Sequence, residues 1–155
     1  ETLKRLSGFC DLLLVEADGA RRLPLKVPAV HEPVIPEFAD IVVGVTGLDC
    51  IGKKICDIAH RPEDVAEFLR KKTDEPVMWE DVVKIASSEN GLRKNVGEKS
   101  FLVYFNKADV LESSGVAENI IKKCREAGIE AVCGSLKKIM ERQEICRKFH
   151  GIRRK

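Results

Sequence analysis

Several features are absent or scarce in this sequence of 155 residues. No Gly-x-x-x-x-Gly-Lys-[Ser/Thr] motif occurs, so the chain shows no phosphate-binding loop of the kind that P-loop nucleotide hydrolases use. There is no secretory signal pattern and no long apolar run, and we therefore expect no membrane partner. Aromatic residues make up only 5% of the chain, and just one of them, Phe149, lies among the basic residues near the carboxyl end, which is too few for base stacking. We therefore expect no specific nucleic-acid partner.

The bulk composition is that of an ordinary globular protein. The 27 Lys and Arg residues nearly balance the 25 Asp and Glu residues, leaving a formal net charge of +2. The 6 cysteines match no small secreted disulfide framework, which predicts reduced thiols in a cytoplasmic protein. The length is enough for one buried core, and we predict a single domain over residues 1–155.

The order of apolar and amphipathic segments predicts a parallel α/β sheet. Apolar runs predict buried strands over residues 9–16, 40–45, 101–105 and 129–133. Helical patterns begin near Arg61-Pro62, at Glu75-Pro76, at Ser113 or Ser114, and near Leu136. Alternation of this kind places the carboxyl ends of the strands along one edge of the sheet. Two long connections, 19–39 and 47–60, are of a length that is commonly functional.

Two carboxylates follow the first predicted strand directly. Alternation along the strand places Glu16 and Asp18 on the same side, close to where the chain leaves the sheet. Paired carboxylates at such a place suit Mg²⁺, and one of them could instead orient a water for phosphoryl transfer. The alternative is a strand-end acid that binds neighbouring backbone amides. We predict Glu16 and Asp18 to be both the catalytic and the metal-binding pair.

A second polar group, Asn106-Lys107-Ala108-Asp109, follows the third predicted strand. This is the arrangement with which guanine-binding GTPases read the base. The carboxylate of Asp109 can accept hydrogen bonds from N1 and N2 of guanine, whereas adenine lacks those donors. We expect Ser135, after the next strand, to contact the same base. The ligand predicted from these residues is GTP, or ATP, and the alternative is an Asn-Asp turn that caps the following helix.

Three further residues raise the possibility of a soft-metal site. Cys50, Cys56 and His60 lie within one connection, but they offer only three ligands and no Cys-x-x-Cys pair. One interpretation is a carrier of metal or selenium. The alternative is buried thiols beside a loop histidine.

A set of motifs occurs in one order along the chain: Val15–Arg21, Leu23–Pro28, His31–Pro36, Gly44–Asp49, Gly52-Lys53, His60–Glu63 and Asn106–Asp109. In this order they resemble the YqeC-type family of selenium-dependent hydroxylase accessory proteins. The resemblance implies a three-layer, mostly parallel α/β sheet of P-loop NTPase type. It also implies a role in maturing selenium-containing molybdenum hydroxylases, with such an enzyme or its cofactor as the partner.

Family members carry a Gly-rich Gly-Lys-Thr loop ahead of the Glu-Ala-Asp-Gly segment. This sequence shows no such loop, so the resemblance implies a fold that lacks its N-terminal strand and phosphate loop. We expect NTP hydrolysis only if such a loop precedes Glu1, and none from this chain alone. The resemblance further implies that a set of five residues covers the phosphates or an acceptor: Lys26, His31, Glu32, His60 and Arg61. A non-catalytic module that binds a cofactor or a partner enzyme is the remaining alternative.

Overall fold

The computed structural model of this chain describes residues 1–137. The last predicted helix, from about Leu136 to Phe149, lies almost entirely outside the described residues, as does most of the basic carboxyl end. Within residues 1–137 no helix combines the length and the apolar character that crossing a bilayer requires.

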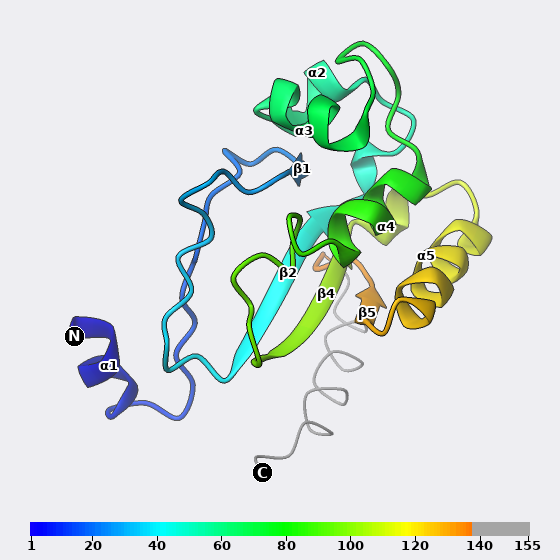
Figure 1. The fold of residues 1–155 in the computed structure, drawn as a ribbon. Coiled ribbons are helices and arrows are strands. Elements are labelled where there is room, and N and C mark those ends of the chain that lie inside the picture. Colours follow the sequence, from blue (N-terminus) through cyan, green and yellow to red (C-terminus); the bar gives the residue numbers. More distant parts are fainter. Residues whose placement is uncertain (138–155) are drawn as a thin grey trace.

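A three-stranded parallel sheet lies at the centre of the molecule (Figure 1). Its strands are β2 (Ile41–Gly47), β4 (Ser100–Asn106) and β5 (Glu130–Cys133), in the order β2-β4-β5. The β2 and β4 strands pair in register from Ile41 opposite Ser100 to Gly47 opposite Asn106. The three later predicted strands and their parallel arrangement are therefore confirmed.

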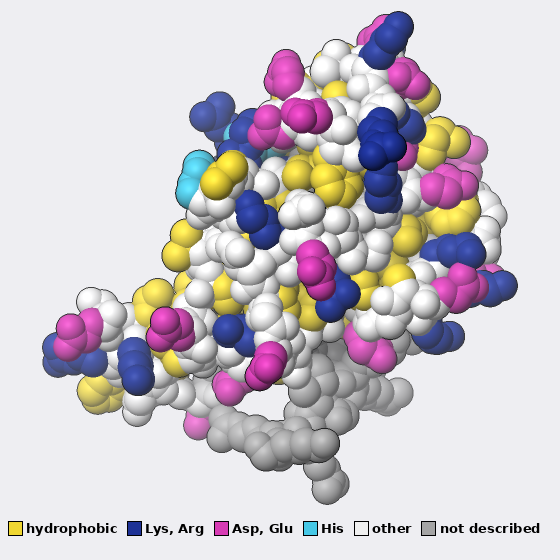
Figure 2. Space-filling view, in the orientation of Figure 1, with side chains coloured by type: hydrophobic (Ala, Val, Ile, Leu, Met, Phe, Trp, Pro, Cys, Tyr) yellow, Lys and Arg dark blue, Asp and Glu magenta, His cyan; other side chains and the backbone are white. Residues whose placement is uncertain are grey.

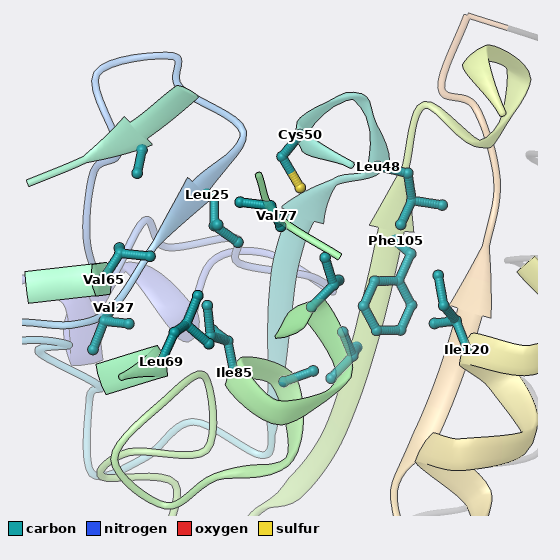
Figure 3. Packing of buried hydrophobic residues seen from close by; sticks show 14 of the residues in the cluster. Leu25, Val27, Leu48, Cys50, Val65, Leu69, Val77, Ile85, Phe105 and Ile120 are labelled. Atoms are coloured by element: carbon teal, nitrogen blue, oxygen red, sulfur yellow. The ribbon is translucent and has the colours of Figure 1, made fainter. Parts of the chain in front are cut away.

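Two helices cover one face of this sheet and enclose the core. The helix α4 spans Trp79–Ser87 and the helix α5 spans Ser114–Glu126. Phe105 of β4 packs in one buried cluster with Ile85 of α4 and Ile120 of α5, and all three side chains are less than 2% exposed (Figure 3). The opposite face of the sheet carries a smaller buried cluster of Leu102, Tyr104 and Val132. Within residues 1–137 the structure thus shows a sheet with one covering layer of helices.

The start and end of α5 are set by local sequence. The hydroxyl of Ser113 accepts a hydrogen bond from the Gly115 amide at 3.2 Å, which satisfies one unpaired amide of the first turn. The chain reverses at Gly128, whose φ of +72° suits a residue without a side chain. The prediction for this helix is confirmed at both ends.

The two long connections contain short elements that sequence patterns did not predict. The first contributes β1 (Leu25–Lys26), and the second contributes η1 (Leu48–Cys50), α2 (Ile55–Ile58) and β3 (Ala59–His60). The strands β1 and β3 pair in parallel, so the two connections are joined to each other. The following helix α3 (Pro62–Leu69) begins at its proline, as predicted.

The helix α4 begins three residues later than the sequence predicts. Pro76 and Val77 form isolated β-bridges with Lys54 and Ile51. These bridges require extended backbone, and α4 therefore starts only after Met78. Pairing with a distant segment decided this boundary.

The first predicted strand, residues 9–16, is not a strand. It follows the short helix α1 (Thr2–Ser7) and runs alongside β2, but separated from it (Figure 1). Phe9, Leu12 and Leu14 are 86%, 74% and 84% exposed. A β-strand forms by hydrogen bonding to a neighbour, and no neighbouring strand pairs with this segment in residues 1–137. The sequence therefore has the apolar run of a buried strand, but no strand among residues 1–137 pairs with it.

Packing at Gly91 gives a prediction about the fold. A Cβ atom on Gly91 would lie 2.0 Å from the Ile85 carbonyl oxygen, which already accepts the Leu92 amide at 2.9 Å. We expect Gly91→Ala to lower the free energy of unfolding by about 1–3 kcal/mol, as overpacking does. Urea unfolding followed by circular dichroism measures this. Gly115→Ala is the control, because its Cβ would meet only the Ser113 hydroxyl oxygen, at 3.4 Å. Equal losses in the two variants would contradict the packing argument.

Candidate functional site

One cavity brings together residues from both predicted groups. It has a volume of about 1980 Å³ and lies between residues 10–18 and β2. Glu16, Asp18, Lys26, Asn106 and Lys107 all line it. Small-molecule pockets usually measure roughly 300–1,000 Å³, so this cavity has room for more than one small ligand. The two predicted groups thus share one cavity.

Lys26 is the most heavily engaged side chain at the Asp18 end of the cavity. It is 6% exposed, and its ammonium donates to the Gly19 carbonyl oxygen at 3.0 Å and to Glu32 Oε2 at 2.9 Å. It also forms an ion pair with Asp18 Oδ2 at 3.0 Å. An ammonium has three hydrogens to donate, and three protein groups receive them here. Lys26 therefore holds the turn that carries Asp18.

Glu32, which the resemblance placed in the cover over the phosphates, is the carboxylate at the centre of this network. It accepts hydrogen bonds from Lys26, from the guanidinium of Arg61 and from the Ala29 amide. The hydrogen bond from Arg61 is the largest cause that lowers the pKa of Glu32 to about 2, while burial opposes the shift. Glu32 is therefore ionised throughout the neutral range and binds both long connections of the chain.

The other residues expected near the phosphates gather around Glu32. Arg61 also forms an ion pair with Asp64, at 3.4 Å. His60 pairs in register with Lys26 across the small sheet, and burial, together with the nearby Arg61 charge, lowers the pKa of its imidazole. His31 is 80% exposed, with Nε2 4.0 Å from a carboxylate oxygen of Glu32. Lys26, His31, His60 and Arg61 thus form one cluster, although only Lys26 among them lines the cavity.

Asn106 organises the second group. Its side-chain oxygen accepts the Lys107 amide at 2.8 Å and the Leu136 amide at 3.2 Å. The Ala108 amide donates to the Gly134 carbonyl oxygen at 2.9 Å, which fastens the same two loops a second time. The loop after β4 and the loop after β5 are therefore held together at the carboxyl edge of the sheet. Ser135 is buried in the second of these loops.

Asp49 ends the Gly44–Asp49 motif, but sequence patterns assigned it no role in the site. Its Oδ2 forms an ion pair with the Lys107 ammonium at 2.7 Å, and its Oδ1 is buried with no hydrogen-bond partner in the described part of the chain. Gly47 allows this placement, since a Cβ there would lie 2.5 Å from Asp49 Oδ1. In the sequence, Asp49 is marked by its position, two residues beyond the end of β2. Asp109 is exposed at the same edge, outside the lining of the cavity.

The segment after β2 has the glycine spacing of a phosphate loop without its geometry. Gly47 to Lys54 reads Gly-x-x-x-x-Gly-Lys-Lys, with lysine in place of the hydroxyl residue. The amides of its glycine and first lysine already have partners, because Gly52 donates to the Val77 carbonyl oxygen at 2.8 Å and Lys53 to the Cys50 carbonyl oxygen at 3.1 Å. A phosphate cradle needs amides that point at the ligand. The Gly52 and Lys53 amides are bonded within the protein instead.

The two cysteines of the predicted soft-metal site differ in burial, and no metal-binding cluster forms around them in the described residues. Across residues 1–137 no group of three or more His, Cys, Asp or Glu side chains is arranged to hold a metal ion. Cys50 is fully buried, and burial raises the pKa of its thiol to about 12, whereas Cys56 is exposed. Cys50, Cys56 and His60 are therefore not arranged as the ligands of a metal carrier site.

The predicted magnesium pair supplies two carboxylates, those of Glu16 and Asp18. The Lys26 ammonium already forms an ion pair with one oxygen of Asp18. Mg²⁺ binding by this pair stays a prediction, because a hydrated Mg²⁺ would need its remaining ligands from water and phosphate.

Comparison with known proteins indicates the family to which the chain is similar. The model of the family described as YqeC protein matches residues 1–63. The uncharacterized protein YqeC of Escherichia coli (strain K12) is 31% identical over 142 residues, which is 90% of this chain and 55% of that protein. The chain thus spans about half the length of the curated relative that it matches. No solved structure matches the chain.

The Glu32 network predicts how stability depends on pH. The folded pKa of about 2 lies below the ordinary 4.5, so Glu32 stabilises the fold above pH 4.5 and loses this contribution as the pH falls toward 2. We expect Glu32→Gln to cost about 2–3 kcal/mol at pH 7 and under about 1 kcal/mol near pH 2. Urea unfolding of parent and variant between pH 7 and pH 2 measures the difference.

The matched control is Glu126→Gln, because Glu126 forms an exposed ion pair with Lys123 on α5. Its substitution should change stability little at any pH, as exposed pairs contribute little. A stability difference for Glu32→Gln that is the same at pH 3 as at pH 7 would count against the network.

Proposed function

Since this chain belongs to the YqeC family, we propose that it is the base-reading and cation-holding part of a nucleotide-binding accessory protein. The proposed fold type is that of the P-loop NTPases, as a single α/β domain. The proposed ligand is GTP, or ATP, with Mg²⁺. The proposed role is to assist the maturation of selenium-dependent molybdenum hydroxylases, with such an enzyme or its cofactor as the partner.

The observation that carries the nucleotide proposal is the position of the Asn106 side chain. One amide oxygen accepts from the loop after β4 and from the loop after β5. A base that binds at this edge therefore meets loops that are already ordered, so less conformational freedom is lost on binding. The Lys107 ammonium is also fixed, through Asp49, on the side of the cavity.

The polar groups on the cavity wall and at the carboxyl edge of the sheet offer partners for the phosphates and the base of a nucleotide. Asp109, just beyond Lys107, supplies the acceptor that guanine N1 and N2 would need. Glu16 and Asp18 supply the carboxylates for a Mg²⁺ bound to phosphate oxygens. Hydrolysis is not proposed for this chain alone, because the Gly52 and Lys53 amides, which a phosphate loop would direct at the ligand, are bonded within the protein.

Asp109→Asn tests base reading. Loss of a charged hydrogen bond of about 1.5–3 kcal/mol should weaken GTP binding roughly 10- to 100-fold. Binding of xanthosine triphosphate should improve, because its 2-oxo group accepts a hydrogen bond from an amide. Titration calorimetry with Mg²⁺ and GTP, ATP or xanthosine triphosphate measures the affinities.

The matched control is Asp74→Asn, an exposed carboxylate in the turn between α3 and α4. It should leave every affinity unchanged. Unaltered GTP affinity in Asp109→Asn, or equal affinities of the parent for GTP and ATP, would overturn the assignment of Asp109.

A further inference from the structure

The turn that leads into β1 carries two arginines on a backbone that arginine rarely adopts. The Leu23 amide donates to the Ala20 carbonyl oxygen at 2.9 Å, which closes a turn of four residues. Its central residues, Arg21 and Arg22, have φ values of +49° and +64°. Two consecutive positive φ values are those of a type I′ turn, in which glycine, asparagine and aspartate predominate. A longer side chain crowds its own backbone there, so these arginines do not favour the turn that carries them.

Contacts on both sides hold this turn in place. Directly before it, the Gly19 carbonyl oxygen accepts the Lys26 ammonium at 3.0 Å. Directly after it, the Pro24 carbonyl oxygen accepts the Gly47 amide at 2.9 Å and the Thr46 hydroxyl at 2.8 Å. A left-handed backbone persists only where the surrounding structure determines it, and such positions cluster at ligand-binding sites. The turn is therefore a rigid support for its two side chains.

The fold makes no use of the two guanidinium groups. Both arginine side chains are exposed, and neither forms an ion pair or a hydrogen bond with any residue of the described part of the chain. An unfavourable backbone, firmly held, thus presents two cations that stabilise nothing within residues 1–137. Their role is to be sought in a ligand.

An imidazole lies within the field of these charges. His60 pairs in register with Lys26, and burial, followed by the charges of Arg61, Arg21 and Lys26, lowers the pKa of its imidazole. Lys26 and Arg61 are both paired with Glu32, whereas Arg21 has no carboxylate partner in residues 1–137. Figure 2 shows Lys and Arg side chains beside histidine at the upper left of the molecule. Positive charge at this place is therefore only partly neutralised by the protein.

A phosphate-type oxyanion is the ligand that these groups fit. A guanidinium binds phosphate through two parallel hydrogen bonds and keeps its charge at every physiological pH. A phosphate group offers oxygens in several directions, so that two guanidinium groups and an imidazole can donate to it together. A carboxylate offers only two oxygens, in one plane.

The position of these groups leaves the cavity to the nucleotide. Arg22 lines the cavity together with Asp18, whereas Arg21 and His60 lie outside its lining. An anion bound by all three would border the cavity and not fill it.

We propose that Arg21, Arg22 and His60 form a binding site for one phosphate-type oxyanion beside the cavity. The oxyanion belongs either to the phosphate chain of the nucleotide or to a second, phosphate-bearing ligand. Because the turn is already rigid, little backbone freedom is lost when the anion binds. The site needs no bound base, so the inference does not depend on the proposed base reading.

Titration of the 155-residue chain with inorganic phosphate, at constant ionic strength, tests the proposal. NMR follows the His60 imidazole and the amides of Arg21 and Arg22. We expect saturable shifts at these groups and a raised pKa of the imidazole, since a nearby anion stabilises its charged form. Acetate should bind at least about 10-fold more weakly, because it makes fewer charged hydrogen bonds. No saturable shift with phosphate, or equal affinities for the two anions, overturns the proposal.

A double variant, Arg21→Asn with Arg22→Gly, separates anion binding from folding. Asn-Gly suits a type I′ turn, so the equilibrium constant for folding, from urea unfolding, should rise at least about 3-fold. Phosphate should bind at least about 10-fold more weakly, because charged hydrogen bonds are lost. Phosphate affinity equal to that of the parent, or a loss of stability, contradicts the proposed role of the arginines.

The matched control is Arg70→Gly. Arg70 is exposed, has a φ of +60° at the end of α3, and lies outside the cavity lining. Its replacement also removes one positive charge from a left-handed residue, so stability should rise while phosphate affinity stays unchanged. An equal loss of phosphate affinity in this variant would mean that net charge alone attracts the anion, which overturns the site.

Saturating Mg²⁺ and GTP distinguish the two sources of the oxyanion. If the phosphate chain of the nucleotide occupies the site, inorganic phosphate no longer binds. If the site serves a second ligand, phosphate binds alongside the nucleotide. Either result supports the site and assigns its ligand. Failure of GTP to bind would contradict the proposed function, while saturable phosphate binding would still support the site.

Discussion

The buried ammonium of Lys26 is the interaction on which the arrangement of the two long connections depends. A charge removed from water is strongly unfavourable unless it is paired and hydrogen-bonded. At 6% exposure, Lys26 meets this requirement by collecting Asp18, Glu32 and the Gly19 carbonyl. Glu32 in turn binds Arg61, which directly follows the second connection. One buried cation thus orders two stretches of chain that have little regular structure of their own.

The carboxyl edge of the central sheet is organised by a neutral group instead. Asn106 joins the loops after β4 and β5 through one side-chain oxygen, and the Asp49–Lys107 ion pair joins the loop after β2 to them. Rigid strands therefore position the polar loops, which is how open α/β sheets build ligand sites. The two clusters lie along one cavity, between residues 10–18 and the edge of β2 that faces away from β4.

Elements with a local cause were predictable. The strands β2, β4 and β5 follow from apolar runs, α3 from Pro62, and α5 from the Ser113 cap and Gly128. The β1–β3 pairing was not predictable, because two-residue strands leave no periodic pattern. The start of α4 was misplaced for a similar reason, since the bridges of Pro76 and Val77 involve residues far back in the sequence.

The amino-acid sequence by itself determined which residues bear the chemistry and where the central strands run, because motif spacing and apolar periodicity are local properties. Only the tertiary structure decided which of those residues have partners. It enclosed Lys26 in an ionic network, separated Cys50 from Cys56 by burial, and set Asp49 against Lys107. It also left residues 12–16 without a strand partner among the described residues. The reason is that burial and hydrogen bonding are completed by segments distant in the chain, which no local pattern encodes.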